Sequence, residues 1–285
     1  MDGIILIDKE KDWTSQDVCS KIKRILKCKK VGHTGTLDPF ATGLLVVTID
    51  QATKISQFIE PLNKSYVAIL NLGEKKSSGD ITGETIETSE IPPFDEEKIK
   101  EALNSLLGKQ EQIPPMTSAI KVDGVPLYRL AHEGQEIARQ SRPIEIFDIK
   151  LLSFDEKTIT FAVDVSKGTY IRTLGETIAE KLGTCGYLSE LRRTKVGKYL
   201  LKDAIKIGEV YENKIVPLNE ALSFLPRYVT NKNEENMVSH GMKIYLNSKD
   251  PIIALYSNQN VLLAIYQKDE EGTYRSLRGF QHGSS

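Results

Sequence analysis

One carboxylate, that of Asp38, stands in a turn rich in glycine and threonine, within the segment GHTGTLDPFATGLL of residues 32–45. Glycines such as Gly35 and Gly43 permit backbone conformations that other residues avoid, and Pro39 disfavours helical geometry at the residue before it. An aspartate held in this way either forms the turn by bonding to its own backbone or serves as a positioned reactive group. Residue types and spacing alone favour the turn former.

Two other kinds of site do not fit this segment. A phosphate-binding P-loop ends in Gly-Lys-Ser/Thr, and no lysine follows Gly35. A metal site needs several ligands, and His33 has no second histidine or cysteine at ligand spacing. We therefore expect neither a nucleotide-binding loop nor a metal here, and the choice remains between a structural and a catalytic aspartate.

Residues 32–45 closely resemble, over fourteen consecutive positions, the signature G-H-x-G-T-L-D-P-x-A-x-G-L-L of the TruB family of bacterial tRNA pseudouridine synthases. In that family the aspartate of the signature is the essential catalytic residue. The resemblance therefore implies that Asp38 is the catalytic aspartate of an enzyme that isomerises uridine to pseudouridine.

Two further segments extend this resemblance. Residues 64–66 match the family's K-x-Y, and residues 166–174 (SKGTYIRTL) match S-x-G-T-Y-I-R-x-L. The resemblance implies that Tyr66 lies against the target base, where its ring would replace the stacking that an extruded pyrimidine loses. It also assigns Arg172 to an ion pair with Asp38, in which a guanidinium would orient the carboxylate and favour its charged form.

Residues 112–134 resemble a family segment that includes a mobile loop clamping the RNA, and we expect such a loop at 114–142. Two positions depart from the family pattern: Thr117 stands where tyrosine is usual, and His132 stands where arginine is usual. We expect these departures to affect the grip on the substrate rather than the bond chemistry.

Residues 186–197 resemble the family's closing block, L-R-R-T-x-x-G, in which the leucine backbone holds the edge of the uracil. For Tyr170, packing in the core is the stronger interpretation, and Asp80 is expected to fix its polar turn rather than to act as a catalyst. The residues expected to bind substrate are His33, Lys121, Arg129, Tyr170, Leu191, Arg192, Arg193 and Lys195.

The composition is that of an ordinary soluble globular protein, with 285 residues, 40% hydrophobic and 27% charged, and a net charge of −1. Any attraction for nucleic acid must therefore be local. Residues 14–30 contain six basic residues and one acidic residue. A solvated helix face is the simpler interpretation of this run, and a surface that steers a polyanion is the alternative.

The three cysteines, Cys19, Cys28 and Cys185, are scattered and form no C-x-x-C pair. This pattern favours neither a disulfide framework nor a zinc site, and it fits a reducing interior. The N-terminus lacks the basic start of a secretion signal, and no apolar stretch is long enough to span a bilayer. We expect a cytoplasmic protein that does not associate with membranes.

Periodicity of the apolar residues predicts the elements that must position these side chains. Strands are expected at residues 3–8, 44–49, 64–73, 144–152, 158–165, 252–256 and 261–266. Helices are expected at residues 14–26, 52–59, 95–107 and 173–182, and residues 231–236 are expected to form a polar linker.

The resemblance implies an α+β pseudouridine synthase fold, with a central, mostly antiparallel sheet flanked by helices and loops. We expect a catalytic domain at residues 1–227 and, because the composition shifts near Tyr228, a small β-rich domain at residues 228–285. The position of this second domain suggests a PUA-like RNA-binding barrel, and a truncated or degenerate version is the alternative.

The predicted function is therefore isomerisation of a uridine in the T arm of tRNA, at position 55 of the T loop, with Asp38 as the nucleophile. The resemblance implies a monomer that uses no cofactor, metal or guide RNA. Two alternatives remain open at this point. One is a noncatalytic RNA-binding or tRNA-folding protein that keeps the synthase scaffold, and the other is a synthase that acts on another RNA, such as a guide-dependent relative.

Overall fold

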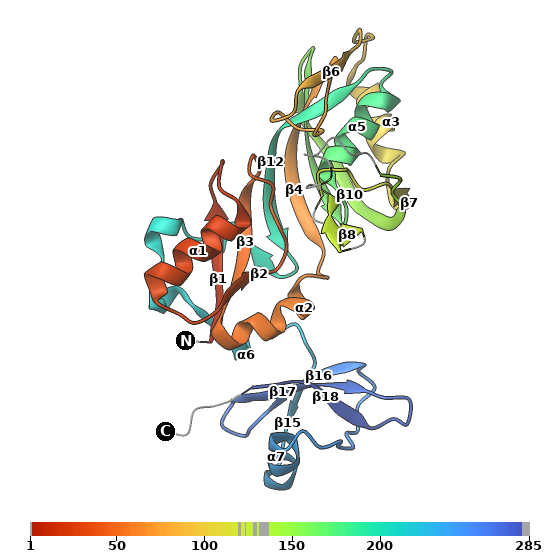
Figure 1. The fold of residues 1–285 in the computed structure, drawn as a ribbon. Helices are drawn as coiled ribbons and strands as arrows, with labels where there is room; N and C mark the ends of the chain where they lie inside the picture. Colours follow the sequence, from red (N-terminus) through yellow and green to blue (C-terminus); the bar gives the residue numbers. More distant parts are fainter. Residues whose placement is uncertain (1, 119–120, 123, 128–129, 131–136, 281–285) are drawn as a thin grey trace.

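A computed structural model describes residues 2–118, 121–122, 124–127, 130 and 137–280. The described residues form a ten-stranded sheet in the larger N-terminal part, a four-stranded sheet toward the C-terminus and two small two-stranded sheets. Figure 1 shows how the two large sheets are arranged. The predicted α+β fold, with a central, mostly antiparallel sheet and a small β-rich C-terminal part, is confirmed.

The large sheet has the strand order β14-β1-β3-β12-β4-β11-β10-β7, with β2 paired to β3 and β13 paired to β12. Neighbouring strands are antiparallel except for β12 and β3, which run parallel. The strands are β1 (Gly3–Lys9), β2 (Val31–His33), β3 (Thr42–Ile49), β4 (Lys64–Leu72), β7 (Gly108–Gln112), β10 (Arg142–Phe154), β11 (Thr158–Val165), β12 (Gly186–Val196), β13 (Tyr199–Leu200) and β14 (Val216–Pro217).

Side-chain patterns explain most of these strands. β4 and β11 alternate buried with half-buried residues, whereas β1 and β3 are almost wholly buried, as their apolar sequences predict. Periodicity does not predict β12, although this strand lies in the middle of the sheet. Its register against β4 shifts between Leu188 and Glu190 and again between Arg193 and Lys195, and these two irregularities break the alternation that marks a strand.

Helices cover the large sheet in two places. α1 (Ser15–Leu26) packs against β2, and it begins at a capping box in which the side chains of Thr14 and Asp17 each accept the other's backbone N–H. α3 (Glu96–Asn104) and α5 (Ile171–Lys181) contact each other and lie on β10 and on β4 and β12, respectively (Figure 1). The predicted helix at 52–59 is a 3₁₀ turn, Asp50–Ile55, followed by the short α2 (Ser56–Ile59).

Several small elements complete this part of the chain. β5 (Glu74–Lys76) and β6 (Thr85–Thr88) form one hairpin, β8 (Lys121–Val122) and β9 (Val125–Pro126) form another, and α6 (Leu218–Ala221) follows β14. In the described residues, no helix is both long enough and apolar enough to cross a membrane.

The C-terminal sheet contains β15 (Arg227–Val229), β16 (Ile252–Tyr256), β17 (Leu262–Lys268) and β18 (Tyr274–Gly279) in that order. The predicted polar linker at 231–236 is wrong, because these residues begin α7 (Lys232–Ser239). The Asn231 side chain accepts the backbone N–H of Glu234, whose carboxylate accepts that of Asn231. This capping box starts a helix in a sequence too polar to show a helical stripe.

The two sheets are joined by a shared apolar cluster. Ile4 and Leu6 of β1 pack in the same cluster as Ala254 of β16, Ile265 of β17 and Phe280. Burial of these apolar side chains away from water holds the small sheet against the N-terminal strands of the large sheet. Figure 1 shows the small sheet beneath α2 and α6.

The single parallel contact of the large sheet depends on Gly43. This residue pairs with Arg193 of β12 and has a φ of +100°, a conformation that side chains disfavour. A Cβ atom at this position would lie 2.3 Å from the Arg193 carbonyl oxygen. Only glycine therefore lets β3 approach β12 at the point where the Asp38 segment enters the sheet.

We predict that Gly43→Ala lowers the free energy of unfolding by about 2 kcal/mol or more, because a positive φ and a backbone clash act together. Urea denaturation followed by circular dichroism measures this change. Gly208→Ala is the matched control, since a Cβ there meets nothing within 4 Å. Equal stability of the two variants would contradict the role given to Gly43.

Candidate active site

The side chains of Asp38 and Arg172 form a close ion pair. Arg172 lies in the first turn of α5, and its Nε atom is 3.0 Å from Oδ2 of Asp38. Its Nη2 atom also donates to Oδ1 of Asp38 at 3.5 Å, so the guanidinium meets the carboxylate side-on. The Arg172 side chain is 5% exposed, whereas that of Asp38 is 32% exposed. One face of the carboxylate can therefore meet a substrate while Arg172 fixes the other.

The remaining donors of Arg172 are also taken. Nη1 donates to the carbonyl of Ser78 at 2.8 Å and lies 3.5 Å from Oδ2 of Asp80, while Nη2 donates to the carbonyl of Thr117 at 3.0 Å. The hydroxyl of Thr117 accepts a further bond from Nη1. One buried cation thus joins three segments that are far apart in the sequence.

Asp80 fixes its own turn, as the sequence predicts, and in addition faces Arg172. Its Oδ1 atom accepts from the Ser78 hydroxyl at 2.9 Å and from the backbone N–H and the hydroxyl of Thr82 at 2.9 and 2.5 Å. The side chain is only 4% exposed. Asp80 therefore positions Arg172 but does not reach the surface at which a substrate would arrive.

Burial makes Asp38 an unusual carboxylate. Burial raises the pKa of Asp38 above its ordinary value, Arg172 opposes that rise, and the second carboxylate, Asp80, adds to it. The sequence predicts only the effect of the arginine. The pKa of Asp38 is raised overall because the carboxylate is partly removed from water and shares Arg172 with Asp80. Carboxylates with a shifted pKa are typical of functional sites.

Two buried cations hold the Asp38 turn through its backbone. Arg193 is 2% exposed and donates to the carbonyls of Leu44 at 2.7 Å, Gly35 at 3.1 Å and Thr36 at 3.4 Å. Lys9 is 1% exposed and donates to the carbonyl of Pro39 at 3.2 Å. Burial lowers the pKa of Lys9 to about 8, which Asp38 partly opposes. The sequence predicts that Arg193 binds substrate, whereas in the structure its buried guanidinium bonds to backbone carbonyls of the turn.

Ser15 and Gln112 make two further contacts that sequence reasoning missed. The Ser15 hydroxyl, at the start of α1, accepts the backbone N–H of Leu37 at 2.9 Å and donates to its carbonyl at 3.2 Å. The Gln112 side chain accepts the N–H of Tyr170 at 2.8 Å and donates to its carbonyl at 3.0 Å, which anchors the start of α5. Gln112 begins the motif block at residues 112–134, so a search for polar side chains within the motif blocks would have found it, whereas Ser15 lies in none of these blocks.

The two predicted tyrosines, Tyr66 and Tyr170, come from β4 and from the residue before α5. Tyr66 pairs with Arg193 across β4 and β12, is 8% exposed and belongs to the apolar core. Since paired residues share a face of the sheet, its ring lies on the face where Arg193 holds the Asp38 turn. Tyr170 is half-buried just before α5, and burial raises the pKa of its hydroxyl.

The other predicted substrate residues differ in accessibility. His33 ends β2, its Nδ1 accepts the N–H of Gly35 at 3.4 Å, and burial lowers its pKa, which favours a neutral ring whose Nε2 can donate. Leu191 is 6% exposed and pairs with Ala68. The Arg192 side chain is 42% exposed but forms an ion pair with Asp8 at 2.9 Å, and Lys195 is exposed. The side chain of Lys121 and the whole of Arg129 and His132 lie outside the described residues.

Two other features bear on the chemistry. Cys19, Cys28 and Cys185 are buried and free. Over the part of the chain that the structure describes, no three His, Cys, Asp or Glu side chains gather as ligands of a metal ion. The site therefore consists of a carboxylate, its guanidinium partner and the groups that hold both in place.

Comparison with known proteins identifies the class. A crystal structure of a Cbf5-Nop10-Gar1 complex contains a chain that matches 98% of this one, with 84% of that chain covered, a TM-score of 0.75 and 25% identity. An H/ACA RNP bound to a substrate RNA containing 2′-deoxyuridine gives a TM-score of 0.74 at 23% identity, over 98% of this chain and 85% of that one. The fold and the paired carboxylate together define a pseudouridine synthase.

Sequence relatives narrow the class to a family. The family model described as TruB family pseudouridylate synthase (N terminal domain) matches residues 23–171. A tRNA pseudouridine synthase B of Bacillus cereus is 39% identical over 284 residues, covering 94% of this chain and 92% of the relative. The enzyme of the same name from Hydrogenovibrio crunogenus is 36% identical over 275 residues, covering 95% and 91%. The chain belongs to the TruB family and is a tRNA pseudouridine synthase, as the sequence motifs predict.

The raised pKa of Asp38 makes a prediction about stability. Because the folded pKa lies above the unfolded one, the charged carboxylate destabilises the fold, and stability from this group falls as pH rises through the folded pKa. Asp38→Asn should therefore be as stable as the wild type, or more stable, at pH 7, and its advantage should shrink toward pH 4. Denaturant unfolding at several pH values measures both effects.

Asp80→Asn is the control for that experiment. Because it removes a buried charge opposite Arg172 and leaves the hydrogen-bonded turn without its carboxylate, we expect a loss of about 2 kcal/mol or more at pH 7. A large loss of stability in Asp38→Asn, with none in Asp80→Asn, would show that the two carboxylates have the opposite roles.

Thr117→Val tests the contact between Thr117 and Arg172. It keeps the shape and the carbonyl but removes the hydroxyl, and we expect kcat on tRNA to fall about tenfold with little change in KM. Thr117→Ser keeps the hydroxyl and should retain activity. Wild-type kcat in the valine variant would mean that the carbonyl alone positions Arg172.

Proposed function

We propose that this enzyme converts the uridine at position 55 in the T loop of tRNA to pseudouridine, using Asp38 as the nucleophile and no guide RNA. The observation that carries the proposal is the side-on pair of Asp38 and Arg172, in which the Asp38 side chain is 32% exposed and that of Arg172 only 5%. The relatives named above, called tRNA pseudouridine synthase B, support a tRNA substrate.

The reaction conserves atoms, which fits a site built from protein side chains. The bond between N1 of uracil and C1′ of ribose breaks, the detached uracil turns, and C5 bonds to C1′. C5 loses a proton and N1 gains one, so no oxidant or cofactor is consumed. Asp38 attacks C6 or C1′, or promotes a glycal, and Arg172 orients the carboxylate in each case.

Access to the base requires that the uridine leave its stack. A loop of folded RNA yields an extruded base more readily than a duplex, and contacts to shape and backbone select it. We assign Tyr66 the role of stacking against that base, because its ring lies on the sheet face beneath the Asp38 turn. Lys195 and the partly exposed Arg192 remain for phosphates, and Arg193 holds the turn instead.

We further propose two domains, a catalytic domain at residues 1–227 and a PUA-like RNA-binding domain from residue 228 onward. The four-stranded sheet with its capped helix supports a folded C-terminal unit rather than a degenerate tail. The shared apolar cluster holds this unit against β1 and β3, so both parts would meet one tRNA in a fixed arrangement within a monomer.

A noncatalytic RNA-binding protein with the same scaffold is the competing function. Such a protein would have no use for a carboxylate whose pKa is raised by burial, because the charged form lowers stability. Arg172 and Asp80 alone would form a satisfied pair. Keeping Asp38 beside them therefore favours catalysis.

The test incubates the purified protein with an unmodified tRNA transcript and with its isolated T-arm stem-loop. We expect pseudouridine at one position, which chemical mapping detects, and a loss of at least about 10⁴-fold in Asp38→Asn with RNA binding retained. A transcript in which that uridine is replaced by cytidine is the control. Conversion elsewhere in the tRNA would correct the target, and an active Asp38→Asn variant would remove Asp38 from its role.

A further inference from the structure

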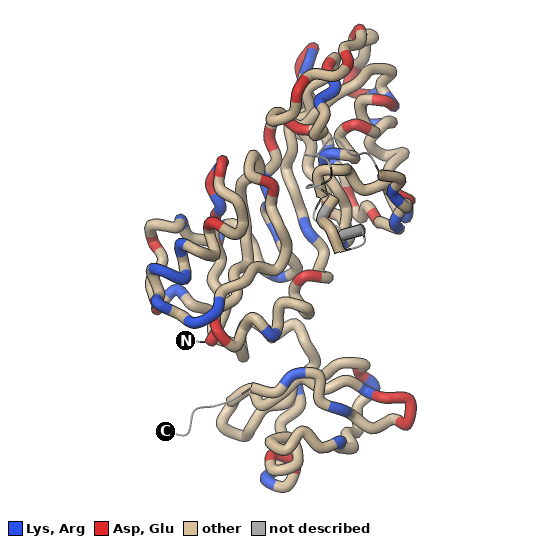
Figure 2. Tube along the Cα trace, in the orientation of Figure 1, with Lys and Arg blue, Asp and Glu red and all other residues tan. Residues whose placement is uncertain are grey.

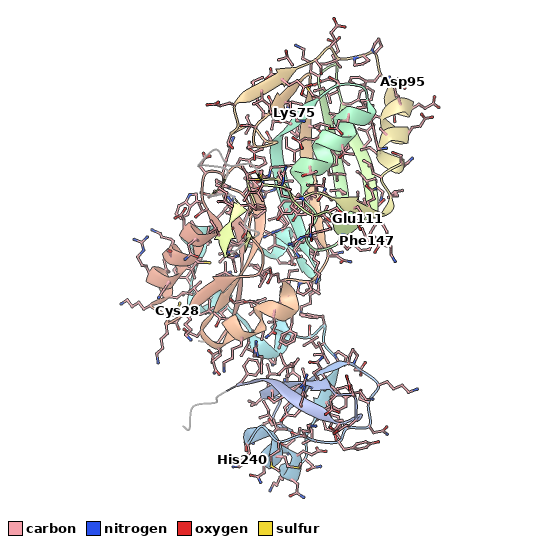
Figure 3. The ribbon with its side chains drawn as sticks, turned by 45° about the vertical axis from the view of Figure 1, so that its right-hand side comes forward. Cys28, Lys75, Asp95, Glu111, Phe147 and His240 are labelled. Atoms are coloured by element: carbon pink, nitrogen blue, oxygen red, sulfur yellow. The ribbon has the colours of Figure 1, made fainter. Side chains whose placement is uncertain are left out.

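A hollow of about 450 Å³ lies beside the catalytic segment, between α1, β2 and the 3₁₀ turn Asp50–Ile55. Figure 2 shows Lys and Arg residues gathered over α1 and the turn after it, and Figure 3 places Cys28, in that turn, on the flank opposite Glu111 of β7. The side chains of the hollow that can bind an anion are Ser20, Lys23, Lys29 and Lys30.

The charges of this hollow are unbalanced. Lys23, Lys29 and Lys30 line it, no carboxylate does, and within the described residues none of the three ammonium groups has an ion pair. The neighbouring Asp50 uses Oδ1 for the backbone N–H groups of Lys29 and Lys30, at 2.8 and 3.0 Å. This contact fixes the turn that carries the two lysines. Three like charges around one concavity favour a bound anion.

A second hollow, of about 610 Å³, also contains lysines but has no excess of positive charge. It lies at the edge strand β7, where Lys109 and Lys167 alternate with Glu111 and Glu145. Its positive and negative charges balance, so it offers no net attraction to a phosphate. The hollow beside α1 is the smaller of the two, but only it has an excess of positive charge among its lining residues.

The position of the hollow indicates which anion it meets. Gly32 lines it, and the chain runs from there through six peptide bonds to Asp38, which spans at most about 20 Å. An RNA whose base lies at Asp38 must bring its backbone past this region. With a net charge of −1, the protein as a whole does not attract RNA, so a local cluster has to do so.

We propose that the hollow formed by Lys23, Lys29 and Lys30 binds a backbone phosphate of the substrate tRNA, outside the nucleotide that reacts. This inference rests on the proposed function, since it takes the RNA to be seated at Asp38. The lysines supply charge, and the Ser20 hydroxyl can donate a hydrogen bond to a phosphate oxygen.

The test measures tRNA affinity in the Asp38→Asn background, where no turnover occurs. The double variant Lys23→Gln/Lys30→Gln removes two charges that line the hollow. The control variant Lys21→Gln/Arg24→Gln removes two exposed charges of α1 that do not line the hollow. We expect the first pair to weaken binding of an unmodified tRNA transcript about tenfold at 0.1 M salt. It should also reduce the slope of log K against log salt by about 1, and the second pair should change neither.

Each outcome decides between explanations. Equal effects of the two double variants would mean diffuse attraction by the basic helix and would overturn the proposal, as would no effect of either. If inorganic phosphate raises the Tm of the wild type but not that of the Lys23→Gln/Lys30→Gln variant, while both bind tRNA equally well, the hollow binds a small anion instead of tRNA. If the slope changes as expected while the wild type forms no pseudouridine in the T arm, the phosphate site stands and the proposed target falls.

Discussion

A buried guanidinium shared by two carboxylates is the interaction on which the rest of the site depends. Arg172 meets Asp38 with Nε and Asp80 with Nη1, and its other donors end on carbonyls and a hydroxyl. A buried charge is tolerated only when its partners are complete, and each donor of Arg172 has one. Burial and the neighbouring Asp80 raise the pKa of Asp38, whereas the cations Arg172, Lys9 and Arg193 oppose that rise. These cations therefore offset part of the cost of keeping the Asp38 carboxylate charged in a partly buried place.

The Asp38–Arg172 pair depends on a firmly held turn. Leu37, Phe40 and Ala41 pack the turn into the hydrophobic core. Its backbone is also held by hydrogen bonds from Arg193, Lys9 and Ser15 to carbonyls on both sides of the aspartate. These donors are buried, so water does not compete for them. Gly43 lets β3 come close enough to β12 for Arg193 to reach across, and the fold thereby fixes the turn that carries Asp38.

Much of this could be predicted from the sequence, for reasons that differ between elements. Apolar runs and alternation predict β1, β3, β4 and β11, because burial of one or both faces leaves a regular pattern. β12 could not be predicted in this way, since two register shifts break its alternation, and α7 could not because its helical signal is a cap in a polar sequence. The motifs predict the Asp38–Arg172 pair, but not that Arg193 faces carbonyls or that Asp80 raises the pKa of Asp38, which depend on contacts across the fold.

The departure at Thr117 shows why a motif can change at this site without losing the pair. Two groups of Thr117 accept from Arg172, and the carbonyl at 3.0 Å belongs to the backbone, so any residue at this position supplies it. The hydroxyl is the part that depends on side-chain identity, and it occupies one Nη1 direction. A larger side chain would have to leave that direction to water or to another acceptor. Thr117 is therefore linked to Arg172 partly through its backbone, and a change in its side chain would alter the orientation of Arg172 without removing the cation that faces Asp38.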